Sequence, residues 1–393
     1  MKSHPTPRQP SRWVALLLYL GPLVAIFDRF SLGPLIFPIS RDFKVPIAQV
    51  AIVATLYYLF YGATQLVFGI ASDRYGRVPV MRFALAGAVA GSVVSALAPN
   101  LAVLVVGRVL TGGFIGGVIP AALVYIGDSF PFRERQRAVA DMSAAQAIGT
   151  TLGVLGAGLL AYYVSWRISF ALTAFLSALL AVALVALPEP DRHPGGGALA
   201  QLRLVFAEPW ALFVIVLSAF EGAAFQGIQI YLAPSLQSRG VSAAVAGTVV
   251  ASYGVATLAG SRLVKPLTRR VSGAALIFTG GTMLVSAYAI ASARQSVASI
   301  LVASTLSGLA FAFMHSTIQT WITEVAPKAR GTATALFATT LFAGAAIGTG
   351  LVAGLAQQRL FGVLFLIAAA LSAAVAFVAG LGRRAYRAVP GLE

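Results

Sequence analysis

The segment GIASDRYGRVPVMRF, residues 69–83, places four charged side chains in the middle of a strongly apolar part of the chain. These side chains are Asp73, Arg74, Arg77 and Arg82. Long apolar runs stand on both sides of the segment, and Gly76 permits a tight reversal between them. This pattern is typical of a polar hairpin that joins two membrane-spanning helices, with its arginines holding the hairpin on the cytoplasmic side.

The composition of the whole chain supports a membrane protein. Of 393 residues, 59% are hydrophobic and 10% are charged, whereas soluble domains carry about 25% charged residues. The net charge of +16 does not indicate nucleic-acid binding, because the basic residues sit in short breaks between apolar runs. The chain has no cysteine, which excludes disulfides, zinc–thiolate sites and thiol catalysis.

Apolar windows of about 20 residues are long enough to cross a bilayer as helices. The sequence contains twelve such windows, and none alternates as a barrel strand does. They cover residues 13–37, 48–71, 80–98, 101–125, 138–163, 166–187, 210–234, 242–262, 274–292, 297–323, 331–356 and 359–381. The predicted fold class is therefore all-α integral membrane, with twelve transmembrane helices.

The distribution of basic residues predicts the orientation. If the N-terminus is inside, most of the 28 Lys and Arg residues fall in segments on the cytoplasmic side, which is the positive-inside bias. Both termini are then cytoplasmic, and residues 69–83 form a cytoplasmic hairpin. The first apolar run lacks an Ala-x-Ala cleavage site and continues to Phe37, so it is predicted to be an uncleaved helix and not a signal peptide.

The chain divides into two similar halves. Residues 125–131 (YIGDSFP) align without gaps on residues 321–327 (WITEVAP), and Gly112 matches Gly308 at the same offset. A Pro- and Gly-rich break separates the halves, and we expect it to be a flexible cytoplasmic linker. The predicted units are an N-terminal six-helix bundle (1–187), the linker (188–209) and a C-terminal six-helix bundle (210–393). Two pseudo-symmetric bundles that meet at the membrane midplane are transporter architecture.

The motif Gly69-x-x-x-Asp73-Arg74-x-Gly76-Arg77 resembles the helix 2–3 signature of the major facilitator superfamily, with departures at Ala71 and Val78. Two further stretches resemble superfamily signatures, the first that of its proton-driven members and the second the antiporter signature of its drug exporters. One is Leu104-x-x-x-Arg108-x-x-Thr111-Gly112 in helix 4, with Thr111 where Gln is common. The other is Gly149-x-x-x-Gly153-Val154-x-x-Ala157-Gly158 in helix 5, where Val154 replaces the usual Pro and Ala157 a Gly.

This resemblance implies a role for the hairpin as a conformational latch. Asp73 would meet the start of helix 11, near Gly331–Thr332, and the following Arg74 would meet Asp128 at the foot of helix 4. The latch would hold the halves together on the inside while the cavity is open to the outside. Its expected residues are Gly69, Asp73, Arg74, Gly76, Arg77 and Asp128. The alternative is a hairpin that only fixes the topology.

Two charged residues fall at matching depths in the N-terminal half. Asp28 lies about 14 Å from the outer end of helix 1 and Arg108 about 11 Å from that of helix 4, at 1.5 Å per residue. If these helices are neighbours, the two can pair. Burial favours a protonated carboxyl group and a guanidinium favours the ionised one, so alternating contact would make Asp28 a proton carrier tuned by Arg108. The alternatives are a static pair of Asp28 with Arg29 or Arg108, or contact with substrate.

Glu221 is the buried acid expected in the C-terminal half, near the middle of helix 7. We find no basic residue at its depth in that half, so it would bind a proton or meet a cationic substrate; the alternative is a protonated glutamate with a structural role. The remaining candidates for the lining of a substrate cavity are Arg29, Gln226, Gln229, His315 and Gln319. His315 alone is more often a packing residue.

The function predicted from these features is a proton-coupled antiporter that exports hydrophobic or cationic small molecules by alternating access. Its closest rival is a proton symporter or facilitator for a small nutrient or organic anion, with Arg29 and Arg108 as anion anchors. We find no catalytic motif in the sequence that would indicate a membrane enzyme. An added soluble signalling domain would favour a sensor, and we find none in the sequence. No metal or other cofactor is expected. The expected setting is a monomer in a bacterial inner membrane.

Overall fold

The computed structural model describes residues 12–190 and 197–386, and the described residues form helices and turns without a strand. The extreme termini and Arg192 lie outside this description, so their predicted cytoplasmic placement is not addressed by it. The first half contains α1 (Arg12–Phe43), α2 (Ile47–Tyr75), α3 (Arg77–Ala96), α4 (Leu101–Ile115), α5 (Val118–Ser129), α6 (Phe132–Tyr163) and α7 (Trp166–Ala183).

The second half follows a short helix, α8 (Ala198–Phe206). It contains α9 (Pro209–Gly222), α10 (Leu232–Gln237), α11 (Ala243–Val250), α12 (Ser252–Leu267), α13 (Gly273–Ala293), α14 (Val297–Ala310), α15 (Ser316–Val325), α16 (Arg330–Leu351), α17 (Ala353–Gln357) and α18 (Phe361–Ala385). Two π-helical segments, Ala223–Ile228 and Phe311–His315, interrupt this half.

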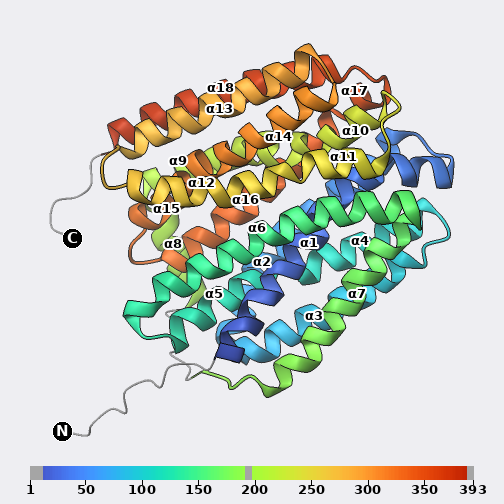
Figure 1. Ribbon diagram of the computed structural model, residues 1–393. Helices are drawn as coiled ribbons and strands as arrows, with labels where there is room; N and C mark the ends of the chain where they lie inside the picture. Colours follow the sequence, from blue (N-terminus) through green and yellow to red (C-terminus); the bar gives the residue numbers. More distant parts are fainter. Residues whose placement is uncertain (1–11, 191–196, 387–393) are drawn as a thin grey trace, which may run out of the picture.

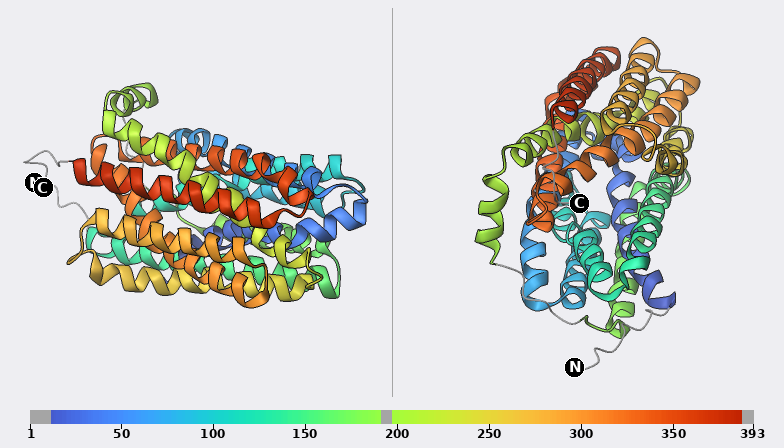
Figure 2. Two further views of the ribbon diagram at one scale, coloured as in Figure 1. Left: turned by 90° about the horizontal axis from the view of Figure 1, so that it is seen from above. Right: turned by 90° about the vertical axis from the view of Figure 1, so that its left-hand side faces the viewer.

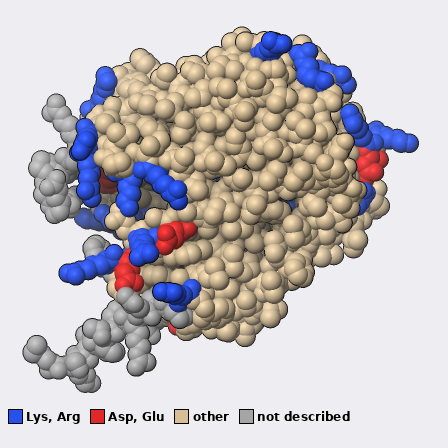
Figure 3. Space-filling view, in the orientation of Figure 1, with Lys and Arg blue, Asp and Glu red and all other residues tan. Residues whose placement is uncertain are grey.

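Twelve helical stretches of the described chain are long and apolar enough to cross a membrane, which confirms the predicted number. Four of the stretches contain more than one α-helix: α4–α5, α9–α10, α11–α12 and α14–α15. Figure 3 shows Lys and Arg side chains at the two ends of the molecule, with a broad band of other residues between them. Such a band is what a bilayer core requires of the surface that it covers.

Local sequence marks where several spans begin and end. The side chains of Asn100, Ser272 and Ser296 accept hydrogen bonds from backbone amides in the first turns of α4, α13 and α14. Such caps satisfy amides that have no partner within the helix. Gly76 separates α2 from α3 with a φ of 107°, a conformation that glycine adopts without strain. The tight reversal expected in the opening hairpin is therefore present.

The helices form two bundles that lie side by side (Figure 1). Within the first bundle, α1 packs on α6 and α3 packs on α4 and α7; within the second, α13 packs on α18 and α9 on α16. The bundles meet where α2 packs on α16 and α6 packs on α11 and α12. The first and last described residues lie at the same end of the molecule (Figure 1), which we call the terminal end.

The segment between the bundles differs from the expected flexible linker. It contains the helix α8, which lies at the terminal end on the outside of the bundles (Figure 2). Glu189, just before the undescribed residues 191–196, accepts hydrogen bonds from the amides of Arg77 (2.6 Å) and Val78 (2.8 Å). This part of the linker is thus tied to the N-terminus of α3, where a carboxylate is favoured by the helix dipole.

The two acids that correspond in the internal repeat both form ion pairs at the terminal end, although their arginine partners stand at positions that do not correspond. Asp128 accepts a hydrogen bond from Arg77 at 3.0 Å, and its counterpart in the repeat, Glu324, pairs with Arg383 at 2.6 Å. The helix breaks also correspond. The interruption between α4 and α5 lies at the same place in the repeat as the π-helical segment Phe311–His315. The two halves therefore share structural details as well as their helix count.

The bundles approach one another closely at the end opposite the termini, which we call the far end. Gly158 of α6 and Gly247 of α11 face one another, and a Cβ on Gly158 would lie 2.9 Å from the Gly247 Cα. Gln237 also donates a hydrogen bond to the Pro34 carbonyl across the interface at 2.8 Å. Small residues allow such contact between membrane helices, so the far end is closed in this conformation.

We expect Gly158→Leu to disfavour this closed far end by roughly 1–3 kcal/mol, because the added side chain overlaps α11. Since the chain has no cysteine, a single Gln237→Cys substitution can report on accessibility. Labelling of this cysteine by a membrane-impermeant maleimide should be faster in the Gly158→Leu background. Gly354→Leu, where a Cβ meets nothing within 4 Å, is the matched control. Equal labelling rates in the two backgrounds would contradict the prediction.

Candidate functional site

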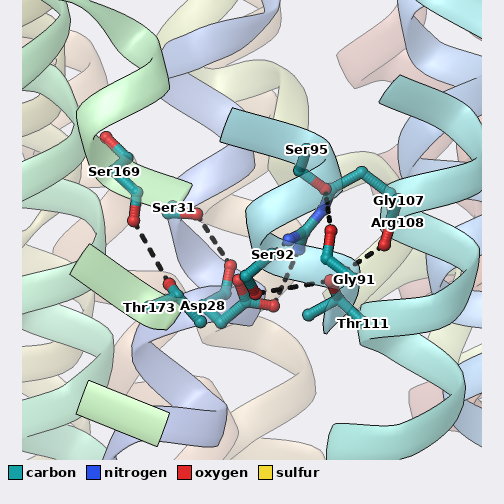
Figure 4. Close-up of polar contacts among 10 residues, drawn as sticks. All are labelled: Asp28, Ser31, Gly91, Ser92, Ser95, Gly107, Arg108, Thr111, Ser169 and Thr173. Carbon is teal, nitrogen blue, oxygen red and sulfur yellow. Dashed lines mark hydrogen bonds and ion pairs between the residues drawn. The ribbon is translucent and has the colours of Figure 1, made fainter. Parts of the chain in front are cut away.

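A buried ion pair joins α1 to α4 inside the first bundle. Arg108 donates hydrogen bonds to both carboxylate oxygens of Asp28, at 2.9 and 2.7 Å (Figure 4). Both side chains are fully buried. The Arg108 guanidinium also lies 4.6 Å from the ring centroids of Tyr57 and Phe170. The predicted pairing of Asp28 with Arg108 is therefore present, whereas its role in proton coupling stays a prediction.

A second buried pair lies in the other bundle. His315 Nδ1 and Glu221 Oε1 are 3.0 Å apart, and Glu221 is fully buried with Oε2 lacking a hydrogen-bond partner. The imidazole stacks on Phe311 with ring centroids 4.2 Å apart. Our expectation that Glu221 has no basic neighbour is wrong. The π-helical segment Phe311–His315 ends at His315, and such segments, common at functional sites, change the direction of the following side chains.

A small cavity of about 30 Å³ lies between the bundles. It is lined by Arg29, Phe30, Gly33, Pro34, Tyr58, Val154, Gln226, Gln229, Ile230, Ala233, Val250 and Tyr253. The Arg29 guanidinium lies over the rings of Phe30, Tyr61 and Phe342, with its central carbon 5.1, 5.6 and 5.2 Å from their centroids. Because Phe342 belongs to the second bundle, Arg29 lies at the interface where the two halves meet.

The hairpin of residues 69–83 carries a network of charged side chains. Arg77 donates from Nη1 to Asp73 at 2.6 Å and from Nε to Asp128 at 3.0 Å. The Glu189 carboxylate also accepts a hydrogen bond from the Arg77 backbone amide, so the network joins α2, α3, α5 and the linker. The hairpin is therefore ordered by specific contacts in addition to the orientation that its charges favour.

Comparison with known families identifies the fold. The family model of the Major Facilitator Superfamily matches residues 18–237 and 216–391. The chain belongs to the major facilitator superfamily. The members of that superfamily are membrane transporters built of two six-helix bundles, and the twelve candidate spans of the described chain fit that arrangement. Among the described residues, no group of three His, Asp or Glu side chains is placed to hold a metal ion.

Individual relatives cover different parts of the chain. A triacylglyceride transporter of Mycolicibacterium hassiacum is 33% identical over 191 residues, which are 47% of this chain and 36% of the relative. The chain thus spans about a third of the length of the curated relatives it matches. An inward-facing bacterial homologue of the human lysosomal transporter Spinster has a TM-score of 0.78 at 20% identity, covering 97% of this chain and 100% of that one. A D-xylose–proton symporter has a TM-score of 0.72 at 16% identity, covering 92% and 96%.

The charged side chains of the hairpin pair differently from our expectation. Arg77, which the motif places four residues after Asp73, makes the contact with Asp128 that we assigned to Arg74. Arg74 lies over the Tyr75 ring at 5.4 Å. Asp73 is 59% exposed and is bound by Arg77, with no hydrogen bond from the described start of α16. The reason is that α2 and α3 meet at Gly76 in an orientation that turns Arg77 inward.

The predicted cavity residues fall into two groups. The structure brings Arg29, Gln226 and Gln229 together around the cavity between the bundles. His315 lies beside Glu221 instead, and Gln319 is exposed on α15. Glu189 contacts the hairpin without having been predicted from the sequence. The only signal for it was an acid between two prolines, which is a common pattern in linkers.

Proposed function

We propose that this transporter is a proton-coupled antiporter that exports hydrophobic small molecules by alternating access between the two bundles. The observation that carries the proposal is a fully buried, titratable carboxyl group in each bundle, Asp28 beside Arg108 and Glu221 beside His315. Charged groups at membrane depth are costly and mark functional sites by default. Each of these carboxyl groups has a cationic or protonatable partner that can take over or release charge.

The chemistry of the first pair suits proton exchange. Protonation of Asp28 removes its negative charge and leaves the Arg108 guanidinium free to shift toward Tyr57 or Phe170. Deprotonation restores the bidentate ion pair, which is the arrangement in the structure. Because breaking a buried pair without neutralising it is strongly unfavourable, the presence of the proton would decide which arrangement of α1 and α4 is stable.

Alternating access is supported by the contacts between the bundles. The far end is closed by the approach of Gly158 to Gly247. At the terminal end, the contacts of Asp73 and Asp128 stay within the first bundle. A conformation open at the far end would bring Asp73 to the start of α16, as the latch requires. Gly69 has space for this movement, since a Cβ there meets nothing within 4 Å.

The proposed cargo is hydrophobic because the cavity lining is largely apolar and aromatic. Curated relatives named triacylglyceride transporters support this class of cargo. We place the protein in a bacterial inner membrane with both termini in the cytoplasm, on the basis of the positive-inside bias. We also propose a monomer, because a single chain supplies both bundles of the pathway.

The second candidate function is a proton symporter or facilitator for a small nutrient or organic anion. Arg29 at the interface is the observation that favours it, since no acid is among the residues that line the cavity. Arg108 does not support it in this conformation, because Asp28 occupies its guanidinium. The departures Val154 and Ala157 from the antiporter signature also leave this candidate open.

Inverted membrane vesicles with an acidic interior distinguish the two functions. Single-chain amphiphiles with cationic, neutral and anionic head groups are added while a dye that responds to the pH gradient is followed. The antiporter should release protons when its cargo is added, and Asp28→Asn and Glu221→Gln should lower this release at equal amounts of folded protein. Asp141→Asn, which changes an exposed acid, is the matched control.

Proton movement together with cargo, or uptake without any response to the gradient, would contradict antiport. In either case a small organic anion is the next cargo to test in the same vesicles. Release that is equally strong in Asp28→Asn, Glu221→Gln and Asp141→Asn would show that neither buried carboxyl group carries the proton.

A further inference from the structure

Arg29 differs from Arg108, the fully buried cation of the first bundle. Arg108 is held by both oxygens of Asp28, whereas the ion pairs between described residues do not include Arg29. Its Nε is buried and has no hydrogen-bond partner. Successive side chains on a helix point about 100° apart, so Asp28 faces α4 while Arg29 faces the second bundle. A cation at this depth is costly unless something compensates it.

The second bundle presents polar side chains to the same cavity. Gln226 and Gln229 lie in and directly after the π-helical segment Ala223–Ile228. They are only 3% and 5% exposed, and their Oε1 atoms have no hydrogen-bond partner. The buried hydroxyl group of Tyr253, which lines the same cavity, is also without a partner. Buried polar groups are nearly always hydrogen-bonded, so unpaired ones that share a cavity need an explanation.

These groups have the chemistry of an anion site. A guanidinium offers a planar fork of donors that suits carboxylate and phosphate groups. The Oε1 atoms of Gln226 and Gln229 are acceptors, so these two amides would present their NH₂ groups to an anion only after rotation of the amide, whereas the Tyr253 hydroxyl group can donate directly. The acids nearest in the two bundles are already engaged, Asp28 by Arg108 and Glu221 by His315. Arg108 binds both oxygens of Asp28, whereas His315 binds only Oε1 of Glu221, and neither acid is among the described residues that line the cavity. A cationic head group in this cavity would therefore meet Arg29 and no carboxylate of the lining.

The rest of the lining is apolar and comes from both bundles, for example Phe30, Val154, Ile230 and Val250. We propose that Arg29, with Gln226 and Gln229, binds the anionic head group of the cargo. The cargo is then an anionic amphiphile, with a carboxylate or phosphate head and an apolar chain. The cavity of about 30 Å³ has room for water only, so the cargo enters when the bundles separate.

This inference deepens the proposed function, and an equilibrium binding measurement without a proton gradient tests it separately from transport. The full chain is placed in nanodiscs of neutral phosphatidylcholine, with empty nanodiscs for subtraction. Radiolabelled dodecanoate and dodecyltrimethylammonium have the same chain length and opposite charges. We expect dodecanoate to bind at least about tenfold more tightly. Arg29→Gln should weaken dodecanoate binding about 30-fold or more and leave the ammonium compound unchanged.

Three further variants complete the design. Arg29→Lys keeps the positive charge and loses the planar set of guanidinium donors. It should therefore weaken dodecanoate binding less than Arg29→Gln does. Gln229→Leu should weaken the binding of dodecanoate and leave the binding of dodecyltrimethylammonium unchanged. Arg294→Gln makes the same change at an exposed arginine and should bind as the unmodified chain does. Arg29 forms no ion pair with a described residue, so Arg29→Gln leaves no acid without its counter-ion. Binding is compared at equal amounts of folded protein, because the substitution also removes contacts with Phe30, Tyr61 and Phe342.

Several results would overturn the proposal. One is equal or tighter binding of dodecyltrimethylammonium by the unmodified chain. Another is dodecanoate binding by Arg29→Gln that matches the unmodified chain. Butyrate tests whether the site requires a long apolar tail on its cargo. If butyrate displaces dodecanoate at equal concentration, the site recognises a small organic anion and not an amphiphile. Binding that follows the proposal while the vesicles show no proton exchange would leave the anion site intact and reject only the coupling.

Discussion

Arg108→Gln is expected to destabilise the protein by about 3–5 kcal/mol, because it leaves the Asp28 carboxylate buried without its counter-ion. Both oxygens of Asp28 accept hydrogen bonds from Arg108, and neither side chain reaches the surface. The lost guanidinium also packs between the rings of Tyr57 and Phe170. The free energy of unfolding can be measured in mixed micelles with increasing amounts of dodecyl sulfate.

The double variant Asp28→Asn/Arg108→Gln separates stability from coupling. Because it removes both charges together, it should lose less stability than the sum of the two single variants. It should nevertheless lower cargo-driven proton release as Asp28→Asn does, since the carboxyl group of Asp28 is absent. A double variant as unstable as the sum would contradict the pairing as the origin of the effect. Proton release from the folded double variant that is as strong as from the unmodified chain would exclude Asp28 as a carrier.

Gly222→Ala is expected to cost about 3 kcal/mol or more, because α9 and α16 touch through their backbones at this position. A Cβ on Gly222 would overlap the Leu341 carbonyl oxygen, and one on Gly344 would overlap the Ala219 carbonyl oxygen. A backbone cannot move aside as the end of a flexible side chain can. Membrane helices rely on such close approach for their association, so the second bundle would have to separate locally.

Gly127→Ala is the matched control for this prediction. Gly127 is also helical, in α5, but a Cβ there meets nothing within 4 Å. The same methyl group should therefore leave stability unchanged or raise it by up to about 1 kcal/mol through helix propensity. The two variants are compared by the same unfolding measurement in mixed micelles. Equal stability of Gly222→Ala and Gly127→Ala would show that the α9–α16 contact tolerates an extra atom.

The fold and part of the site were predictable from the sequence because they depend on quantities that run along the chain. Hydropathy alone marked twelve spans, and the spacing of breaks and repeats marked two halves. Counting residues from the span ends placed Asp28 and Arg108 at the same depth, since rise per residue in a helix is constant. Their pairing then needed only that α1 and α4 be close enough to bring the side chains together.

The direction in which each side chain points around its helix, and therefore its partner, was decided only by the tertiary structure. Asp28 and Arg29 are adjacent in sequence, yet one pairs within its bundle and the other faces the opposite bundle. Rotation of each helix about its axis depends on packing, and hydropathy alone does not specify it in a chain that is apolar on most faces. The π-helical segments change that rotation further, and the Glu221–His315 contact depends on it.

The hairpin illustrates the same division on a smaller scale. Its charges and Gly76 predicted a reversal on the cytoplasmic side, because both signals are local. Which arginine binds Asp128 depended on the angle between α2 and α3, and the Arg77 contact followed from it. The sequence by itself determined the spans, the halves and the matching depths of Asp28 and Arg108. The tertiary structure decided which charged side chains meet, including Glu221 and His315, because the direction of a side chain around its helix is set by packing.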